Sequence, residues 1–188
     1  MQRTWWFLLA AVIPLGGAAA APAPGACTYR GTAAELKGRL SPLDSTELSV
    51  NGATIKVCYG RPSIRGRVIM DSLVPFGEPW RLGANEPTRL VLPFAATVAG
   101  VRVPAGTYSL YVVPSKTTWE IHVNRDVNRW GIPIDSVVQA QDVGTGTVPV
   151  ETLPQTVDQL TLRLVAGTPV ELVVTWEKTR VRIPIQPR

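Results

Sequence analysis

From residue 42 onward, apolar and polar residues alternate in short segments, the pattern of strands with one face on a core and one face in water. Residues 118–124 (TWEIHVN) show it most cleanly, because Trp119 begins an apolar face and His122 lies on the opposite, polar face. Further strands are predicted at 41–50, 53–60, 88–94, 96–103, 107–113, 157–165, 170–178 and 180–185. About nine or ten short strands with almost no helix predict an all-β, antiparallel β-sandwich or jelly-roll-like single domain with one long irregular loop.

Turn sequences separate these strands. Asn51-Gly52 favours a tight turn whose two central residues have positive φ, so residues 41–60 are predicted to form a β-hairpin. Residues 144–146 (GTG) are predicted to be a turn between two weaker strand candidates, 136–142 and 147–153. Residues 125–134 interrupt the alternation and are predicted to form a second loop.

The long loop spans residues 59–87 and contains four arginines. Long irregular segments between strands are where binding residues are usually found, because the strands form a rigid scaffold that positions them. We therefore expect any functional site to involve this loop.

The N-terminus has the features of a secretory signal. A charged start with Arg3 precedes the apolar run 5–13, and small residues follow at 16–21. We predict a signal peptide over residues 1–20, with Pro14 and the glycines arguing against a membrane anchor. Residues 21–41 are then an N-terminal tether in which 32–40 can form a short helix, and residues 42–188 form the β-sandwich domain.

The charge is modest and evenly distributed. Removal of Arg3 with the signal lowers the net charge from +5 to +4, and no lysine-rich tract is present. A nucleic-acid partner would require a concentrated basic face, so we expect none. No transmembrane segment is expected after signal cleavage, and the predicted location is periplasmic or extracellular.

The chain has two cysteines, Cys27 and Cys58. Exported chains retain disulfides, so a Cys27–Cys58 bond is predicted. The alternatives are lipid attachment at Cys27, because Gly25-Ala26-Cys27 is similar to the end of a lipobox, and free thiols. Pro24 stands where a lipobox has a leucine-like residue, so the disulfide is the preferred interpretation.

A family resemblance extends over most of the mature chain. The residues that carry it are Arg61-Pro62-Ser63, Gly66-Arg67, Leu73-Val74-Pro75-Phe76-Gly77, Trp80-Arg81, Gly83-Ala84-Asn85-Glu86, Ala105-Gly106-Thr107-Tyr108-Ser109-Leu110, Trp119, Asn124 and Trp130-Gly131. Over residues 42–176 the chain resembles the domain-of-unknown-function family 2911, a family of uncharacterised bacterial exported proteins. Phe76 replaces a more usual tyrosine, and residues 70–72 replace a phenylalanine-glycine pattern. The resemblance implies an exported, mostly β domain and supplies no activity.

The arginines of the loop are candidates for an anion site, because a guanidinium offers a planar fork of donors to carboxylate or phosphate. Arg61, Arg65, Arg67 and Arg81 are the candidates. The alternative is structural, since a loop of this length must satisfy its own backbone polar groups. In that case the arginines bond carbonyls and pair with acids such as Asp71 or Glu86.

Asn85 and Glu86 are candidates for an amide and a carboxylate in a cleft. A carboxylate with a raised pKa can act as an acid or base, and Asp126, Glu120 or Asp71 could supply the second acid of a hydrolase. The alternative is that Glu86 pairs with Arg81 or with Arg89.

Histidine and tryptophan complete the candidate list. His122 is the only histidine, so a two-histidine metal site is excluded, and we expect no metal and no cofactor.

Trp80 and Trp130 lie in loops and could contact a ligand or plug one end of the sandwich. Trp119 and Trp176 alternate with β-branched residues and are predicted to belong to the core.

Three hypotheses follow. The first is a non-enzymatic binding module with a small anionic or carbohydrate ligand in a cleft between loops 59–87 and 124–132. The second is a hydrolase with Glu86 as acid or base. The third is an envelope protein-interaction domain without a small-molecule site, its protein partner unknown.

Overall fold

The computed structural model describes residues 27–188, so the predicted signal peptide lies outside the described residues. The elements are α1 (Ala33–Lys37), β1 (Leu43–Val50), β2 (Ala53–Gly60), β3 (Thr88–Leu92), β4 (Ala96–Val98), β5 (Val101–Val103), β6 (Gly106–Pro114), β7 (Thr118–Asn124), α2 (Ser136–Gln139), β8 (Asp142–Val165) and β9 (Val170–Pro187).

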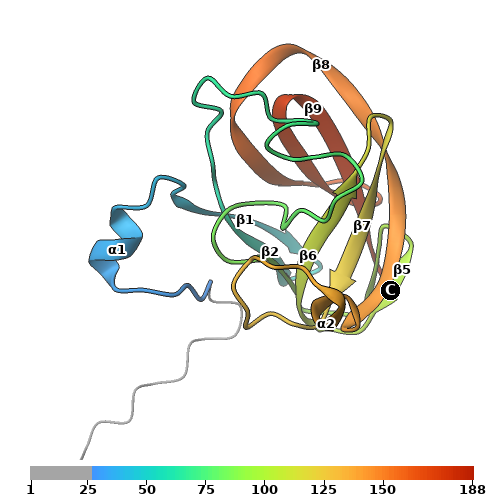
Figure 1. The fold of residues 1–188 in the computed structure, drawn as a ribbon. Helices are drawn as coiled ribbons and strands as arrows, with labels where there is room; N and C mark the ends of the chain where they lie inside the picture. The colour runs from blue at the N-terminus through green and yellow to red at the C-terminus, as the bar shows by residue number, and fades with distance from the viewer. Residues whose placement is uncertain (1–26) are drawn as a thin grey trace, which may run out of the picture.

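The strands form one antiparallel sheet in the order β1-β2-β3-β6-β7-β8-β9-β4-β5. β8 joins the two halves of this sheet, because residues 142–149 pair with β7 and the later residues pair with β9. Irregular register between residues 152 and 161 accompanies the arch of β8 around β9 (Figure 1). The far end of β8 returns to β1, where the Leu164 N–H donates to Thr46 Oγ1 at 3.0 Å. The predicted antiparallel all-β fold is confirmed, and jelly-roll connectivity stays a prediction.

Two tight turns form β-hairpins: the first was predicted, whereas the second divides the predicted single strand 96–103 into β4 and β5. Asn51 and Gly52 connect β1 to β2 with φ values of 51° and 79°, as the Asn-Gly signal predicts. Ala99 and Gly100 connect β4 to β5 with φ values of 47° and 86°.

The predicted strand at 136–142 is wrong, because residues 136–139 form the short helix α2. Asp135 caps this helix, and its Oδ1 accepts the N–H groups of Val137 and Val138, both at 3.1 Å. A side-chain acceptor at this position satisfies donors that the first turn leaves free, which favours a helix over a strand.

The predicted turn at 144–146 is also wrong, because β8 continues through it without a break. A Cβ on Gly146 would lie 1.8 Å from the Ala99 carbonyl oxygen, and one on Gly144 would lie 2.9 Å from Val101 Cγ1. These glycines therefore allow the β4–β5 hairpin to lie directly on β8, and they do not mark a chain reversal.

The core is one continuous cluster inside the curved sheet. Trp119 and Trp176 belong to it and are 1% and 2% exposed, as their alternation with β-branched residues predicts.

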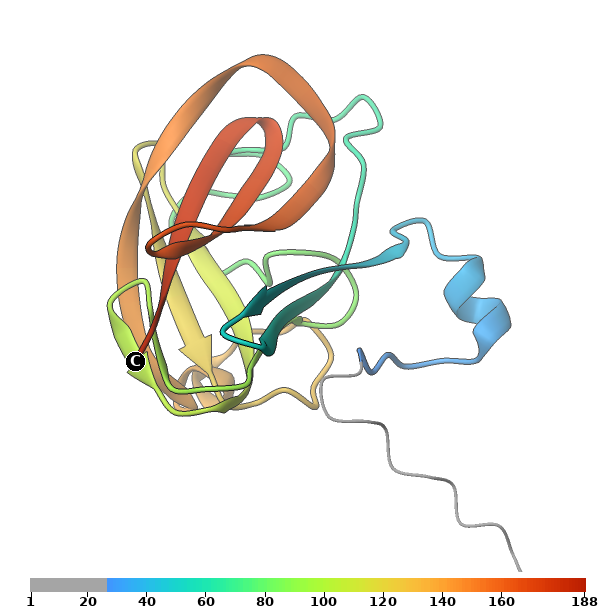
Figure 2. The ribbon, with the colours of Figure 1, turned by 180° about the vertical axis from the view of Figure 1, so that it is seen from behind.

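An N-terminal arm, residues 27–42, precedes β1. Its only helix, α1, lies within the predicted 32–40 segment and buries none of its residues. α1 stands to one side of the sheet in both views (Figures 1 and 2). The arm begins at a Cys27–Cys58 disulfide, which confirms the predicted pairing and joins the arm to β2.

Candidate functional site

The loop between β2 and β3 is held to the sheet by its own backbone. Trp80 exchanges both of its backbone hydrogen bonds with Val112 of β6, at 2.7 and 2.8 Å. The Ile64 N–H donates to the Asp158 carbonyl at 2.9 Å, and the Ala84 N–H donates to the Gly60 carbonyl at 3.2 Å. These backbone hydrogen bonds hold the loop in place against the strands. Figure 1 shows the loop in green.

Three loop arginines stabilise the local structure. Arg61 donates to the Leu160 carbonyl at 3.2 Å and pairs with Asp44 at 3.4 Å. Arg67 donates to the Ile64 carbonyl at 2.9 Å and to the Ser63 carbonyl at 2.8 Å. The third, Arg65, donates to the Leu40 carbonyl. Arg61 thus makes the kind of contacts that the structural alternative describes, and its acidic partner is one that the sequence did not suggest.

Trp80 packs into an aromatic cluster beneath the loop. Its ring stacks on Trp176 with centroids 5.7 Å apart and planes at 21°. Trp119 meets the same ring nearly perpendicularly at 5.8 Å. One face of Trp80 is thus covered by Trp176, and the side chain joins the loop to the core.

A cavity of about 290 Å³ lies beside this cluster. Its lining combines apolar and aromatic walls with two arginines and contains no acidic side chain: Ser41, Pro62, Arg67, Leu73, Val74, Trp80, Arg81, Gly83, Ala84 and Trp176. The formal charge of the lining is therefore positive, and a small pocket with an apolar wall and a few polar groups is typical of a ligand site.

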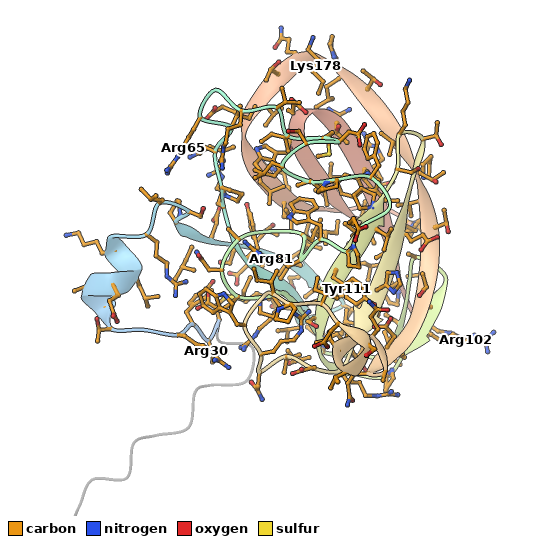
Figure 3. The ribbon with its side chains drawn as sticks, in the orientation of Figure 1. Arg30, Arg65, Arg81, Arg102, Tyr111 and Lys178 are labelled. Carbon is orange, nitrogen blue, oxygen red and sulfur yellow. A yellow bond between two sulfur atoms is a disulfide. The ribbon has the colours of Figure 1, made fainter. Side chains whose placement is uncertain are left out.

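Arg81 differs from the other loop arginines. Its Nε is buried and has no hydrogen-bond partner within residues 27–188. Burial lowers the pKa of Arg81, and the nearby positive charge of Arg129 lowers it further. No carboxylate of the described chain offsets these effects, so Arg81 is a half-buried cation that an anion would stabilise. In Figure 3 Arg81 lies near the middle of the view, whereas Arg102 points outward from β5.

The two loops meet, but the expected cleft between them is filled at the point of contact. The Gly131 N–H donates to the Asn85 carbonyl at 2.9 Å. A Cβ on Gly131 would lie 2.3 Å from Arg81 Cδ, so the loops are in direct contact there. The cavity lies instead between loop 59–87, the arm at Ser41 and β9 at Trp176.

Glu86 pairs with neither Arg81 nor Arg89. Its carboxylate accepts two bonds from Arg39, at 2.6 and 2.9 Å, and one from the Arg30 backbone N–H at 2.8 Å. Burial alone would raise the pKa of Glu86, but these hydrogen bonds outweigh burial and lower it. Glu86 therefore holds the N-terminal arm against the loop.

The remaining candidates lie outside the cavity. Trp130 is 41% exposed, with the Arg39 guanidinium carbon 6.0 Å from its ring centroid. Asp126 stabilises its own loop, where Oδ1 accepts the Asn128 N–H at 3.3 Å. His122 lies on β7 and contacts Asp142, and neither residue lines the cavity.

Sequence reasoning missed three residues that matter here. Ser41 and Trp176 line the cavity, but nothing local marks a serine in a tether or a core tryptophan as a lining residue. Arg39 lies in the arm 47 residues before its partner Glu86, so only the fold brings the two together.

Comparison with protein families gives a match over most of the chain. The family model described as "Protein of unknown function (DUF2911)" matches residues 41–185. The chain belongs to the DUF2911 family. The DUF2911 match confirms the resemblance inferred from the loop motifs, and its description names no activity. No curated protein and no solved structure matches the chain. Within residues 27–188, no helix is long and apolar enough to cross a membrane.

Proposed function

We propose that this DUF2911 protein is an exported, non-enzymatic binding protein for a small organic anion, held in the cavity between loop 59–87 and Trp176. The observation that carries the proposal is Arg81, a half-buried arginine at the cavity wall whose buried Nε has no hydrogen-bond partner and which forms no ion pair in the described chain. An anionic group on the ligand would supply the missing counterion through charge-assisted hydrogen bonds.

The lining supports a ligand with an apolar body. Trp80, Trp176, Leu73 and Val74 provide a wall without hydrogen-bonding requirements, apart from the indole N–H groups. Arg67 is the second cation of the lining, and its Nε and Nη2 are engaged by loop carbonyls. A small carboxylate attached to a ring fits these requirements better than an uncharged sugar, because a sugar leaves Arg81 without a counterion.

Binding is better supported than hydrolysis. A general acid needs a carboxyl group that stays protonated near neutral pH. The pKa of Glu86 is lowered and both of its oxygens are occupied by Arg39, so this carboxylate suits an anchoring role. Export is supported by the Cys27–Cys58 disulfide, because such bonds persist in oxidising compartments.

The test is isothermal titration calorimetry with probe pairs that differ only in charge. Glucuronate is compared with glucose, and benzoate with benzyl alcohol, on the untagged chain without residues 1–20. We expect one or both anions to bind and their neutral counterparts not to bind. Glucose binding that is independent of Arg81 would favour the carbohydrate alternative, and no binding by either anion would contradict the proposal.

The variants are Arg81→Met and, as a matched control, Arg102→Met on the exposed side of β5. Methionine keeps the length of the arginine stem and removes the charge. We expect Arg81→Met to abolish anion binding without loss of stability, because it removes a half-buried cation that has no acidic partner. Arg102→Met should bind as the wild type does. Equal binding by both variants would remove Arg81 from the site.

A further inference from the structure

A second polar cluster lies on β6, β7 and β8, and none of its residues lines the cavity. Asp142 Oδ2 accepts the Tyr111 hydroxyl at 2.6 Å and contacts His122 Nδ1 at 2.9 Å. Asp142 Oδ1 accepts the Asn124 amide at 2.7 Å. The ring of His122 also stacks on Tyr111, with centroids 4.3 Å apart. The imidazole is therefore fixed in position by contacts on several sides.

The contact with a carboxylate determines the tautomer of His122. A carboxylate only accepts hydrogen bonds, so Nδ1 carries the proton and the neutral ring has its lone pair on Nε2. Nε2 is buried and has no hydrogen-bond partner within the described residues. The nearest acidic atom is Glu120 Oε2, 3.7 Å away, on a side chain that is 55% exposed.

We propose that His122 and Glu120 bind a borderline divalent metal ion such as Zn²⁺, with Asp142 as a positioning residue. Zinc lies about 2.0–2.1 Å from a histidine nitrogen and about 2.0–2.2 Å from a carboxylate oxygen. An ion at these distances from two atoms 3.7 Å apart subtends an angle of about 125°, near tetrahedral geometry. A metal-binding histidine typically donates its other N–H to a carboxylate, which is the arrangement of Asp142.

The site has two protein ligands, and water would fill the remaining positions. Within residues 27–188 no three His, Cys, Asp or Glu side chains converge on one point, and Asp142 contacts the nitrogen that faces away from the ion. Glu120 is the solvent-exposed member of the pair, and with two protein ligands the site binds more weakly than a four-ligand structural zinc site.

The experiment is a Zn²⁺ titration of the purified, untagged protein at pH 7, followed by ¹H–¹⁵N multiple-bond NMR of the imidazole. His122 is the only histidine in the chain, so its two ring nitrogens need no further assignment. We expect a saturable 1:1 shift that is larger at Nε2 than at Nδ1. Mg²⁺, which prefers oxygen ligands, should leave Nε2 unshifted.

Substitutions distinguish the proposed metal ligand, Glu120, from the positioning residue, Asp142. Glu120→Gln should raise the Kd at least tenfold, whereas Asp158→Asn, at an exposed carboxylate outside the cluster, should not change it. Asp142→Asn should raise the Kd about 10- to 100-fold and change the Nδ1 and Nε2 shifts of the metal-free ring. If Asp142→Asn does not fold, Glu120→Gln alone decides. An unshifted Nε2 at millimolar Zn²⁺, or an equal Kd for Glu120→Gln and the wild type, would overturn the proposal.

Discussion

Arg39 and Glu86 form a bidentate ion pair, with Nη1 2.6 Å from Oε2 and Nη2 2.9 Å from Oε1. The Arg30 N–H also donates to Oε1, at 2.8 Å. The Glu86 carboxylate thus binds both ends of segment 30–39 to the β2–β3 loop. Helix α1 lies in this segment and buries none of its residues, so it adds little to the attachment. Arg39 and Glu86 are 14% and 6% exposed at their side chains, so the pair is largely screened from water.

Replacing Glu86 by glutamine should destabilise the protein. Glutamine keeps the shape of the side chain, but it leaves Arg39 as a poorly solvated cation without a counterion. Loss of one partner of a buried pair costs about 3 kcal/mol at the lower end of measured cases. Urea unfolding of Glu86→Gln measures the loss. Glu78→Gln, at an exposed loop position, is the matched control and should change the unfolding free energy by less than about 0.5 kcal/mol. Equal losses in the two variants would show that the pair contributes no stability.

The contribution of Glu86 should depend on pH. Because the pKa of Glu86 is lowered in the folded protein, the unfolded chain takes up this proton first on acidification. The stabilisation is complete above the ordinary glutamate pKa of about 4.3 and is lost as the pH falls through the lower folded value. The stability difference between wild type and Glu86→Gln should therefore shrink below about pH 4. Urea titrations at pH 7, 5, 4 and 3 measure it, and a constant difference would contradict the assignment.

The tyrosines should resist ionisation in the folded state. Burial is the main cause in each case, and it raises the pKa of Tyr29 and of Tyr59 to about 12. The pKa values of Tyr108 and Tyr111 are raised as well. Since the unfolded pKa is about 10, the protonated phenols stabilise the fold fully below pH 10, and this stability is lost as the pH rises towards 12. Absorbance at 295 nm should show clearly less tyrosinate at pH 11 in native protein than in urea. Overlapping titration curves would refute the prediction.

Gly146 should not tolerate a side chain. An alanine Cβ there would lie 1.8 Å from the Ala99 carbonyl oxygen, so the β4–β5 hairpin would have to move away from β8. Overpacking of this kind typically costs about 1–3 kcal/mol. Gly38→Ala is the control, because its nearest neighbouring atom is 3.6 Å away and its φ is −82°. Thermal unfolding should give a lower Tm for Gly146→Ala and no loss for Gly38→Ala, and a wild-type Tm for both would argue against close packing at β8.

Local patterns were enough to predict the strands and the first hairpin. Period-2 alternation specified β7 and the buried positions of Trp119 and Trp176, because the side chains of a strand alternate between its faces. The same local reasoning failed at residues 144–146, where glycine indicates a turn in sequence but serves a close approach between distant segments. A strand was wrongly predicted at 136–142, because the Asp135 cap stabilises a helix there despite the strand preference of the β-branched residues that follow it.

The sequence by itself determined the all-β class, the DUF2911 resemblance, the cysteine pairing and the loop that carries Arg81. These depend on local periodicity, on motifs, or on having only two cysteines to pair. The tertiary structure alone decided which arginine meets Glu86, that the buried Nε of Arg81 has no hydrogen-bond partner in the described chain, and that Ser41 and Trp176 share a cavity with Arg81. Such pairings join residues from distant parts of the chain, and only the packing of the whole sheet brings them together.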